Sequence, residues 1–563
     1  MRYNKYFVIA LASISLVGTS CADIDDQNPE GQVLTDGQKN DSETAVPSRV
    51  EAGLVGMYSM MGKMGTFFGE DGNGTANPRD DDGGYPSICL SNDLNGPDMV
   101  SDNSGYNWFS VASDYSDRTA NYANPRMRYG LFYNQIGAAN EIIGSISDDD
   151  ANSQRRQYLG QALACRAFSY LNLAPYYQFN YTSSKDKPCV PIVTESTVDV
   201  NNNPRATVEK VYELILSDLN RAKKLLDDYT PKNNSYIDLG VVNGLLARAY
   251  LSMGMYAEAA EAAKEAIATT SATPASREEV SHPSFCNMSE HNWMWAVATS
   301  ATDGAAFPGP QWASQLASFS GNGYTTQLAI YRRINSLLYS KISDTDIRKQ
   351  WWVDDNLHST LLDGQKWVSK DNSGKETVFE GQDIATGVIA DQKMAFVPYT
   401  NVKFGMKNSL GNSTNINDWP LMRVEEMYLI QAEGLAMSGH LPEGKNVLEQ
   451  FVKSYRDPNY TCKATSVDKF QNEVWFQRRI ELWGEGFSMF DIMRLHKPVV
   501  RFHGTDTENW PTAYCFNMSA DDGYLLMRFS QKETNNNKAI IDNTDGTSPK
   551  SMQNPNLKDG VTD

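Results

Sequence analysis

The stretch DLGVVNGLLARAYLSMGMYAEAAEAAKEAIAT, residues 238–269, is the strongest indication of fold class in this chain. In its first half, apolar residues recur every three or four positions and so share one face of an α-helix: Val242, Leu245, Leu246, Ala249, Tyr250 and Met253. Gly254 then interrupts, and alanines follow at helical spacing: Ala259, Ala260, Ala263 and Ala266. Such small side chains allow a partner helix to approach closely. The stretch therefore predicts two antiparallel helices.

The order of small and aromatic residues here resembles the tetratricopeptide (TPR) helix pair. One such pair cannot bury its own apolar face, so further pairs must stack on it. We expect the frame to comprise residues 129–178, 207–269, 421–456 and 467–497. The fold class that follows is mostly α, with four TPR-like helix pairs, loop-rich insertions and little β-structure.

Local signals refine this frame. Asn152, with the aspartates before it, and Thr207 are expected to cap helices, because their side-chain oxygens can accept from free backbone N–H groups. Residues 467–495 predict one long helix. Trp293 and Trp295 alternate as in a strand and are expected in the core.

The charged residues of the last helix are expected to be structural, not catalytic: Arg478, Arg479, Glu481, Glu485, Asp491 and Arg494. Side chains three residues apart are neighbours on a helix, which places Arg478 beside Glu481 and Asp491 beside Arg494. A network of ion pairs that locks the frame accounts for this cluster.

Composition describes a globular, acidic chain. It has 563 residues, 40% hydrophobic, and a formal net charge of −19 with no basic cluster, which argues against nucleic acid as a partner. Twenty-eight tyrosines and eleven tryptophans exceed what a core must use. Residues 65–124 and 271–418 lack sustained periodicity, and long loops on a rigid frame are where binding residues are expected.

The N-terminus predicts a lipoprotein. Residues 1–20 combine early basic residues with an apolar run too short to span a bilayer, as in a secretory signal peptide. Cys21 follows small residues and is expected to become the acylated N-terminus. Residues 21–47 then form a polar tether, and residues 48–563 a single folded domain.

The other six cysteines leave up to three disulfides open, with Cys165 expected as a buried free thiol. No CxxC or HExxH motif occurs, so no metal or other cofactor is expected. The acidic run Asp80 to Asp82 does not have EF-hand spacing and is interpreted as solvated loop charge.

A family resemblance rests on several stretches taken together. These are ALACRAFSYLNL at 162–173 with CVPIV at 189–193, NNPRATVEKVYELILSDLNRA at 202–222, DWPLMRVEEMYLIQAEGLAMSG at 418–439, QRRIELWGEGFSMFDIMR at 477–494 and RFSQKETNNN at 528–537. In this order they resemble the SusD/RagB family of lipid-anchored, nutrient-binding outer-membrane proteins of the Bacteroidetes. The resemblance implies a cell-surface lipoprotein that captures a glycan and delivers it to a SusC-like TonB-dependent transporter, acting as its lid, without catalysis.

Ligand contacts are expected from aromatic rings that stack on sugar faces, beside polar groups that bind hydroxyls. The candidates are Tyr106, Asn107 and Trp108 in the first loop region and Trp312 and Tyr324 in the second, with burial in the core as the competing interpretation of each. Two other functions stay open. A surface glycoside hydrolase needs a pair of carboxylates in a cleft, and no pair stands out. A TPR-type scaffold or import protein would instead bind a peptide.

Overall fold

The computed structural model describes residues 36–62, 80–300, 312–321, 323–370, 373–501 and 509–543. The predicted signal peptide, Cys21 and the first part of the tether lie outside these residues. The chain divides into two units, residues 1–52 and 53–563. In the first unit, helix α2 (Asp36–Ala45) is followed by the start of α3 (Ser48–Ser59). Among the described helices, none combines the length and the apolar character that crossing a bilayer requires.

The two helices predicted from residues 238–269 are α10 (Leu239–Met253) and α11 (Tyr256–Thr269). Asp238 caps α10, because its carboxylate accepts from the backbone N–H of Val241 at 2.9 Å. Gly254 ends the helix in the left-handed conformation, at φ 71°, which glycine adopts without steric cost. The predicted pair is confirmed.

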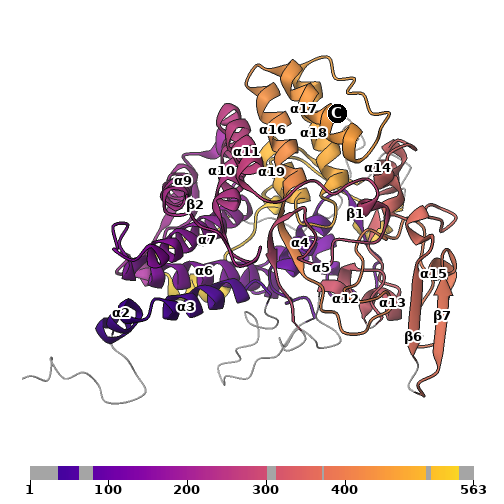
Figure 1. Ribbon diagram of the computed structural model, residues 1–563, viewed down its shortest axis with the longest axis horizontal. Helices are drawn as coiled ribbons and strands as arrows, with labels where there is room; N and C mark the ends of the chain where they lie inside the picture. The colour runs from indigo at the N-terminus through magenta and orange to yellow at the C-terminus, as the bar shows by residue number, and fades with distance from the viewer. Residues whose placement is uncertain are drawn as a thin grey trace, which may run out of the picture. The chain divides into compact units, whose positions relative to one another are not determined.

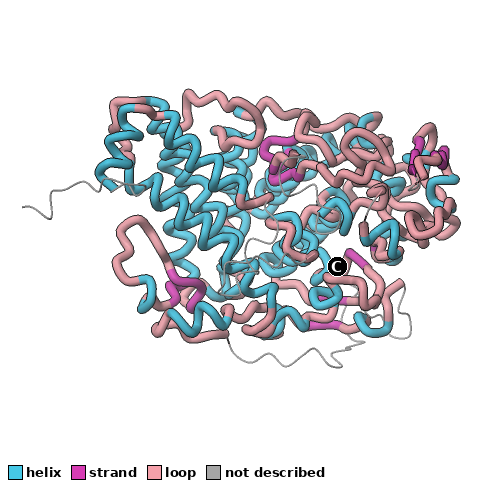
Figure 2. The backbone as a smooth tube through the Cα atoms, turned by 90° about the horizontal axis from the view of Figure 1, so that it is seen from below, coloured by secondary structure: helices cyan, strands magenta, loops and turns pink. Residues whose placement is uncertain are grey.

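Further helices stack on this pair to form a continuous frame (Figures 1 and 2). Along the stack each helix packs against the next: α6 (Ala123–Ser145), α7 (Ser153–Tyr177), α9 (Val208–Leu225), α10, α11, α16 (Val424–Met437) and α17 (Leu441–Tyr455), with α18 (Val467–Glu481) also on α16. Asn152 and Thr207 cap α7 and α9 as predicted. The mostly α fold class is confirmed.

Small residues lie where neighbouring helices cross. A Cβ atom on Gly434 of α16 would meet the Tyr256 carbonyl oxygen of α11 at 2.6 Å. One on Gly444 of α17 would meet the Ala432 carbonyl oxygen of α16 at the same distance. These glycines therefore set how closely the frame helices approach.

The single long helix predicted over residues 467–495 is wrong. The structure has α18, a turn, and then α19 (Ser488–Leu495). Gly484 and Gly486 in the turn have φ values of 82° and 91°, outside the helical region. Apolar periodicity continues across the turn, so spacing alone does not reveal the break.

The remaining elements are mainly short and surround the frame. They are α4 (Tyr85–Asn95), β1 (Met99–Val100), α5 (Ser110–Ser113), α8 (Tyr181–Ser184), β2 (Pro188–Pro191), β3 (Arg205–Thr207), β4 (Trp293–Val297), α12 (Trp312–Leu316), α13 (Tyr324–Leu328), β5 (Arg333–Ile334), α14 (Ser336–Lys341), β6 (Lys366–Lys370), β7 (Glu376–Glu380), α15 (Asp383–Thr386), β8 (Trp419–Arg423), β9 (Val499–Val500), β10 (Asn517–Met518) and α20 (Gln531–Asn536). Each strand pairs antiparallel with one other: β1 with β5, β2 with β3, β4 with β8, β6 with β7, and β9 with β10. Trp293 and Trp295 are buried in β4, as expected.

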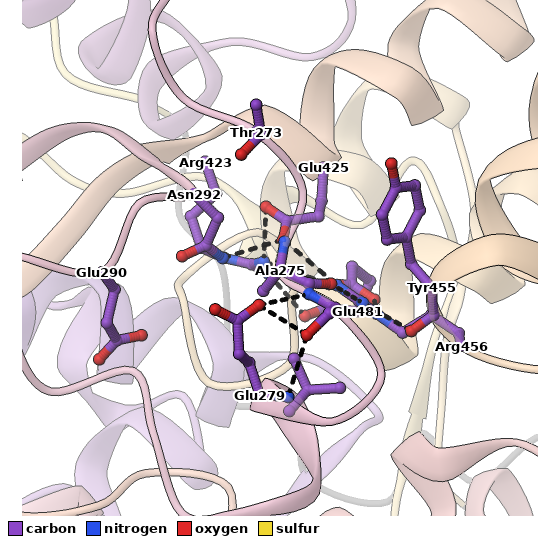
Figure 3. A network of polar contacts seen from close by, with 12 residues as sticks. Thr273, Ala275, Glu279, Glu290, Asn292, Arg423, Glu425, Tyr455, Arg456 and Glu481 are labelled. Carbon is purple, nitrogen blue, oxygen red and sulfur yellow. Dashed lines mark hydrogen bonds and ion pairs between the residues drawn. The ribbon is translucent and has the colours of Figure 1, made fainter.

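A buried ion network joins these parts (Figure 3). The Glu481 carboxylate at the end of α18 pairs with Arg456 at 2.8 Å and with Arg423 at 3.1 Å. Both arginines also pair with Glu425 at the start of α16, at 3.2 and 3.1 Å. Glu425 in turn accepts from the Asn292 side-chain amide at 2.9 Å. The charged cluster is structural, as predicted.

The predicted partners within that cluster are partly wrong. Arg478 pairs with Asp491 of α19 at 2.8 Å rather than with Glu481 on its own helix. Asp491 does bind Arg494, at 2.7 Å. The turn after α18 brings α19 back beside it, so contacts between the two helices replace contacts along one helix.

The structure also tests the predictions for the cysteines and for the aspartate run. None of the six cysteines in the described part of the chain forms a disulfide, and Cys165 is a buried thiol, as expected. Asp81 and Asp82 are buried, at 1% and 2% exposure, so their interpretation as solvated loop charge is wrong.

Candidate functional site

Strand pairing brings the two predicted ligand-binding regions together. Met99 of β1 lies opposite Ile334 of β5, so the loop that follows β1 starts beside the segment that follows α13. An ion pair of 2.6 Å between Arg333 and Asp102 fixes the start of that loop.

Asn107 anchors the loop from inside. It is 2% exposed, and its amide group makes four hydrogen bonds. It donates to the Ser101 hydroxyl at 3.1 Å and the Asp102 carbonyl at 2.9 Å, and accepts from the Phe109 N–H and an Arg332 Nη1 at 3.2 Å each. With the buried Phe109, it holds the residues on either side toward solvent.

Those residues are Tyr106 and Trp108, which are 65% and 38% exposed. Among the described residues, no other aromatic side chain is as exposed as these two. Aromatic surface is ordinarily buried, so an exposed pair on an anchored loop is an unusual use of these residues.

Tyr324, the first residue of α13, completes what we call the aromatic patch (Tyr106, Trp108 and Tyr324). The Trp108 indole nitrogen donates to the Tyr324 hydroxyl at 3.0 Å, and that hydroxyl donates to the carboxylate of Asp80. Burial, together with the hydrogen bond to Asp80, raises the pKa of Tyr324 to about 12. Its phenol therefore stays protonated at neutral pH and keeps this chain of hydrogen bonds intact.

The five predicted ligand residues thus fall into two groups. Tyr106, Trp108 and the half-buried Tyr324 lie at the surface, and a hydrogen bond joins the last two. Asn107 is the buried anchor. Trp312 is 3% exposed and packs in the core, with its ring centroid 4.8 Å from that of Trp419.

Asp80 is a site residue that sequence reasoning missed. Its aspartate cluster was the available signal, but nothing in the sequence relates it to a tyrosine 244 residues away.

The described residues contain no group of His, Cys, Asp and Glu side chains able to hold a metal ion.

Chemically, the patch offers an apolar ring face with polar atoms at its edge. A sugar has a complementary pattern, because its C–H face is apolar and its hydroxyls lie around the rim. The aromatic patch therefore suits the binding of a sugar ring. The Asp80 carboxylate supports the patch, because it accepts a hydrogen bond from the Tyr324 hydroxyl.

Two sequence profiles match the chain. The SusD-like family described as "Starch-binding associating with outer membrane" matches residues 85–251, and the SusD family (SusD/RagB) matches residues 296–557. Among curated proteins, a SusD-like protein of Formosa agariphila is 24% identical over 413 residues, which cover 70% of this chain and 75% of that one. A second from the same organism is 22% identical over 400 residues, 66% of this chain and 73% of that one.

Solved structures share the fold. A SusD-like carbohydrate binding protein from Bacteroides vulgatus has a TM-score of 0.69 at 22% identity, over 88% of this chain and 97% of that one. A laminarin binding SusD-like protein has a TM-score of 0.58 at 18% identity, over 88% and 98%. The stacked helical frame, the sequence profiles that match in both halves and these relatives agree: the chain belongs to the SusD/RagB family.

Proposed function

We propose that this protein binds an oligosaccharide at the aromatic patch. The observation that carries the proposal is the exposure of Tyr106 and Trp108, while every other described aromatic side chain is at least partly buried. The solved relative that binds laminarin supports a glycan as the ligand class. Stacking of a sugar ring on Trp108 supplies the apolar contact, and polar groups beside it bind hydroxyls.

The proposal includes the cellular setting that the family suggests. Acylation at Cys21 anchors the protein to the outer membrane at the cell surface. A SusC-like TonB-dependent transporter receives the bound glycan, with this protein as its lid. Two observations test this setting: Cys21→Ala should move the protein out of the membrane fraction, and the native protein should copurify with a transporter.

Glycan binding is tested with the protein lacking residues 1–21, against plant, fungal and host glycans and peptides, by affinity electrophoresis and calorimetry. We expect a glycan to bind and Trp108→Ala to weaken it at least about tenfold, equivalent to ~1.4 kcal/mol. Val198→Ala is the control, because Val198 is 99% exposed and lies in a different loop.

Other outcomes separate the alternatives. Binding of peptides alone would favour a peptide importer. Release of smaller products from a labelled oligosaccharide would favour a glycoside hydrolase over a protein that only binds the glycan. Equal glycan binding by Trp108→Ala and the unchanged protein would remove the aromatic patch as the site.

A further inference from the structure

The short helix α13 turns one side of its surface to solvent. Thr325 and Thr326 face inward, because both are fully buried and their hydroxyls donate to backbone carbonyls at 2.9 and 2.7 Å. Residues three and four positions apart are neighbours on a helix surface. Tyr324, Gln327 and Leu328 therefore lie together on the opposite side, and none of the three is buried. We call these three residues the α13 face.

The α13 face begins at the aromatic patch, because Tyr324 belongs to both and its hydroxyl accepts from Trp108 at 3.0 Å. Its other end is apolar, where Leu328 is 40% exposed. Met394 lies at that same end and is 44% exposed. Its backbone N–H donates at 2.8 Å to the Thr326 carbonyl, one of the open carbonyls of the last turn. Exposed apolar surface thus continues past the patch for one helical turn, roughly 5.4 Å.

Gln327 supplies the polar group beside these apolar side chains. It is partly exposed, and its side-chain amide makes no hydrogen bond with the described residues. The Asn107 amide, by contrast, is fully engaged inside its loop. A carboxamide offers two N–H donors and a carbonyl acceptor, and sugar hydroxyls both donate and accept. A free amide beside apolar side chains therefore suits a sugar ring.

The small size of this surface favours a sugar over a protein partner. Stable protein–protein interfaces cover about 800 Å² on each partner. Leu328 and Met394 are two apolar contacts with one amide beside them. A sugar ring matches a surface of this kind, with its C–H face on the apolar side chains and its hydroxyls at the amide.

We propose that the α13 face binds a further sugar residue of the same glycan chain, and that the Gln327 amide binds the hydroxyls of that residue. This inference rests on the proposed binding of an oligosaccharide at the aromatic patch. The three rings of the patch hold the first sugar residues, while Leu328 and Met394 contact a later one. The protein therefore binds long oligosaccharides more tightly than short ones.

Laminari-, cello-, malto-, xylo- and manno-oligosaccharides are the probes, each with two and with six sugar residues, titrated into the folded protein by calorimetry. In the series that binds, we expect Gln327→Ala to weaken the six-residue chain by about threefold to tenfold, the range for one hydrogen bond. Binding of the two-residue chain should be unchanged. Trp108→Ala should weaken both lengths.

Two further variants separate this site from a general effect on the fold. Leu328→Ala removes the apolar contact and should also weaken only the six-residue chain. Gln531→Ala is the matched control, because Gln531 is an exposed glutamine at the start of another helix, α20. It should change the affinity for neither length. Thermal melts of all three variants should match that of the unchanged protein.

The outcomes distinguish this inference from the glycan proposal beneath it. If Trp108→Ala weakens binding but Gln327→Ala affects both chain lengths equally, or neither, the α13 face is not a further subsite and the aromatic patch stands. Equal affinity of the unchanged protein for two-residue and six-residue chains would likewise overturn it. If no oligosaccharide of any series binds, the glycan proposal falls and this inference falls with it.

Discussion

Trp108 illustrates how one hydrogen bond prepares a side chain for binding. Its indole nitrogen donates to the Tyr324 hydroxyl, which fixes the orientation of a ring that is 38% exposed. A ring held in place loses less conformational freedom when a ligand stacks on it. The neutral Tyr324 phenol, whose pKa burial raises to about 12, keeps this arrangement across the physiological pH range.

Replacing Tyr324 by Phe removes the hydroxyl and leaves the ring. If the aromatic patch binds glycan, we expect affinity to fall by about threefold to tenfold, since one hydrogen bond contributes roughly 0.5–1.5 kcal/mol. The melting temperature should change little, because Tyr324 is only half-buried. Calorimetry and thermal melts measure both quantities. Glycan affinity equal to that of the unchanged protein would show that the ordered Trp108 ring is not needed.

The sequence predicts candidate site residues, but it does not separate those at the surface from those in the core. Exposed Tyr106 and Trp108 and buried Trp312 have similar sequence surroundings, rich in Gly, Ser and Asn. Their exposure depends on what packs over each loop. The contact between Trp108 and Tyr324 joins residues 216 positions apart, which no local pattern encodes.

Helices of the frame depend on glycines where they cross. Gly434 of α16 faces the backbone of α11, where an added Cβ would lie 2.6 Å from the Tyr256 carbonyl oxygen and 2.8 Å from the Ala260 nitrogen. Backbone atoms cannot move aside as a flexible side chain can. The spacing of these two helices is therefore set by the missing side chain.

Gly434→Ala should lower the free energy of unfolding by about 1–3 kcal/mol, because it forces two packed helices apart. Gly137→Ala is the matched control. Gly137 also lies within a helix, α6, but nothing stands within 4 Å of its added Cβ. There alanine should stabilise by roughly 0.5–1 kcal/mol. Urea denaturation gives both values, and a loss of similar size at both positions would contradict this account.

The sequence was most informative about these helices. Residues 238–269 show a clear helical period and a terminating glycine, and α10 and α11 follow closely. Residues 467–495 show the same period but fold as two helices, because Gly484 and Gly486 adopt positive φ. Whether a glycine sits within a helix, as Gly434 does, or ends one depends on tertiary contacts.

Glu481 connects parts of the fold that are distant in sequence. Its buried carboxylate contacts Arg348, Arg423 and Arg456, which come from three separate segments. Burial alone would raise the pKa of Glu481, but these arginines hold it well below its usual range. Residues 271–418, which contain Arg348, are thus joined to the helical frame by one buried network of ion pairs.

Glu481→Gln should cost about 3–5 kcal/mol of unfolding free energy, because three buried arginines lose a shared counter-ion. Glu213→Gln is the control, since Glu213 pairs with Lys210 on the surface, where both side chains are more than half exposed. There the loss should be about 0–1 kcal/mol. Denaturation curves measure the loss in each variant. A loss as small in Glu481→Gln as in Glu213→Gln would show that the ion pairs of Glu481 contribute no more to stability than a surface pair.

The same carboxylates make stability depend on pH in a defined direction. Glu485 and Asp491 are buried too, yet neighbouring cations hold the pKa of each below its usual value. Because these pKa values are depressed in the folded state, the stabilisation is complete above the unfolded value, about 4. It is lost as pH falls through the folded values. Unfolding free energy measured from pH 7 to pH 3 should decline below about pH 4, with a shallower decline in Glu481→Gln.

The six cysteines of the described residues form no disulfide and are placed so that they can report how this protein opens. Cys89, Cys165, Cys189, Cys462 and Cys515 are buried, and Cys286 is partly covered. A thiol reagent can reach a buried sulfur only when the surrounding segment opens. The rate at which each cysteine is labelled therefore measures how often its own part of the fold unfolds, and no cysteine has to be introduced by mutation.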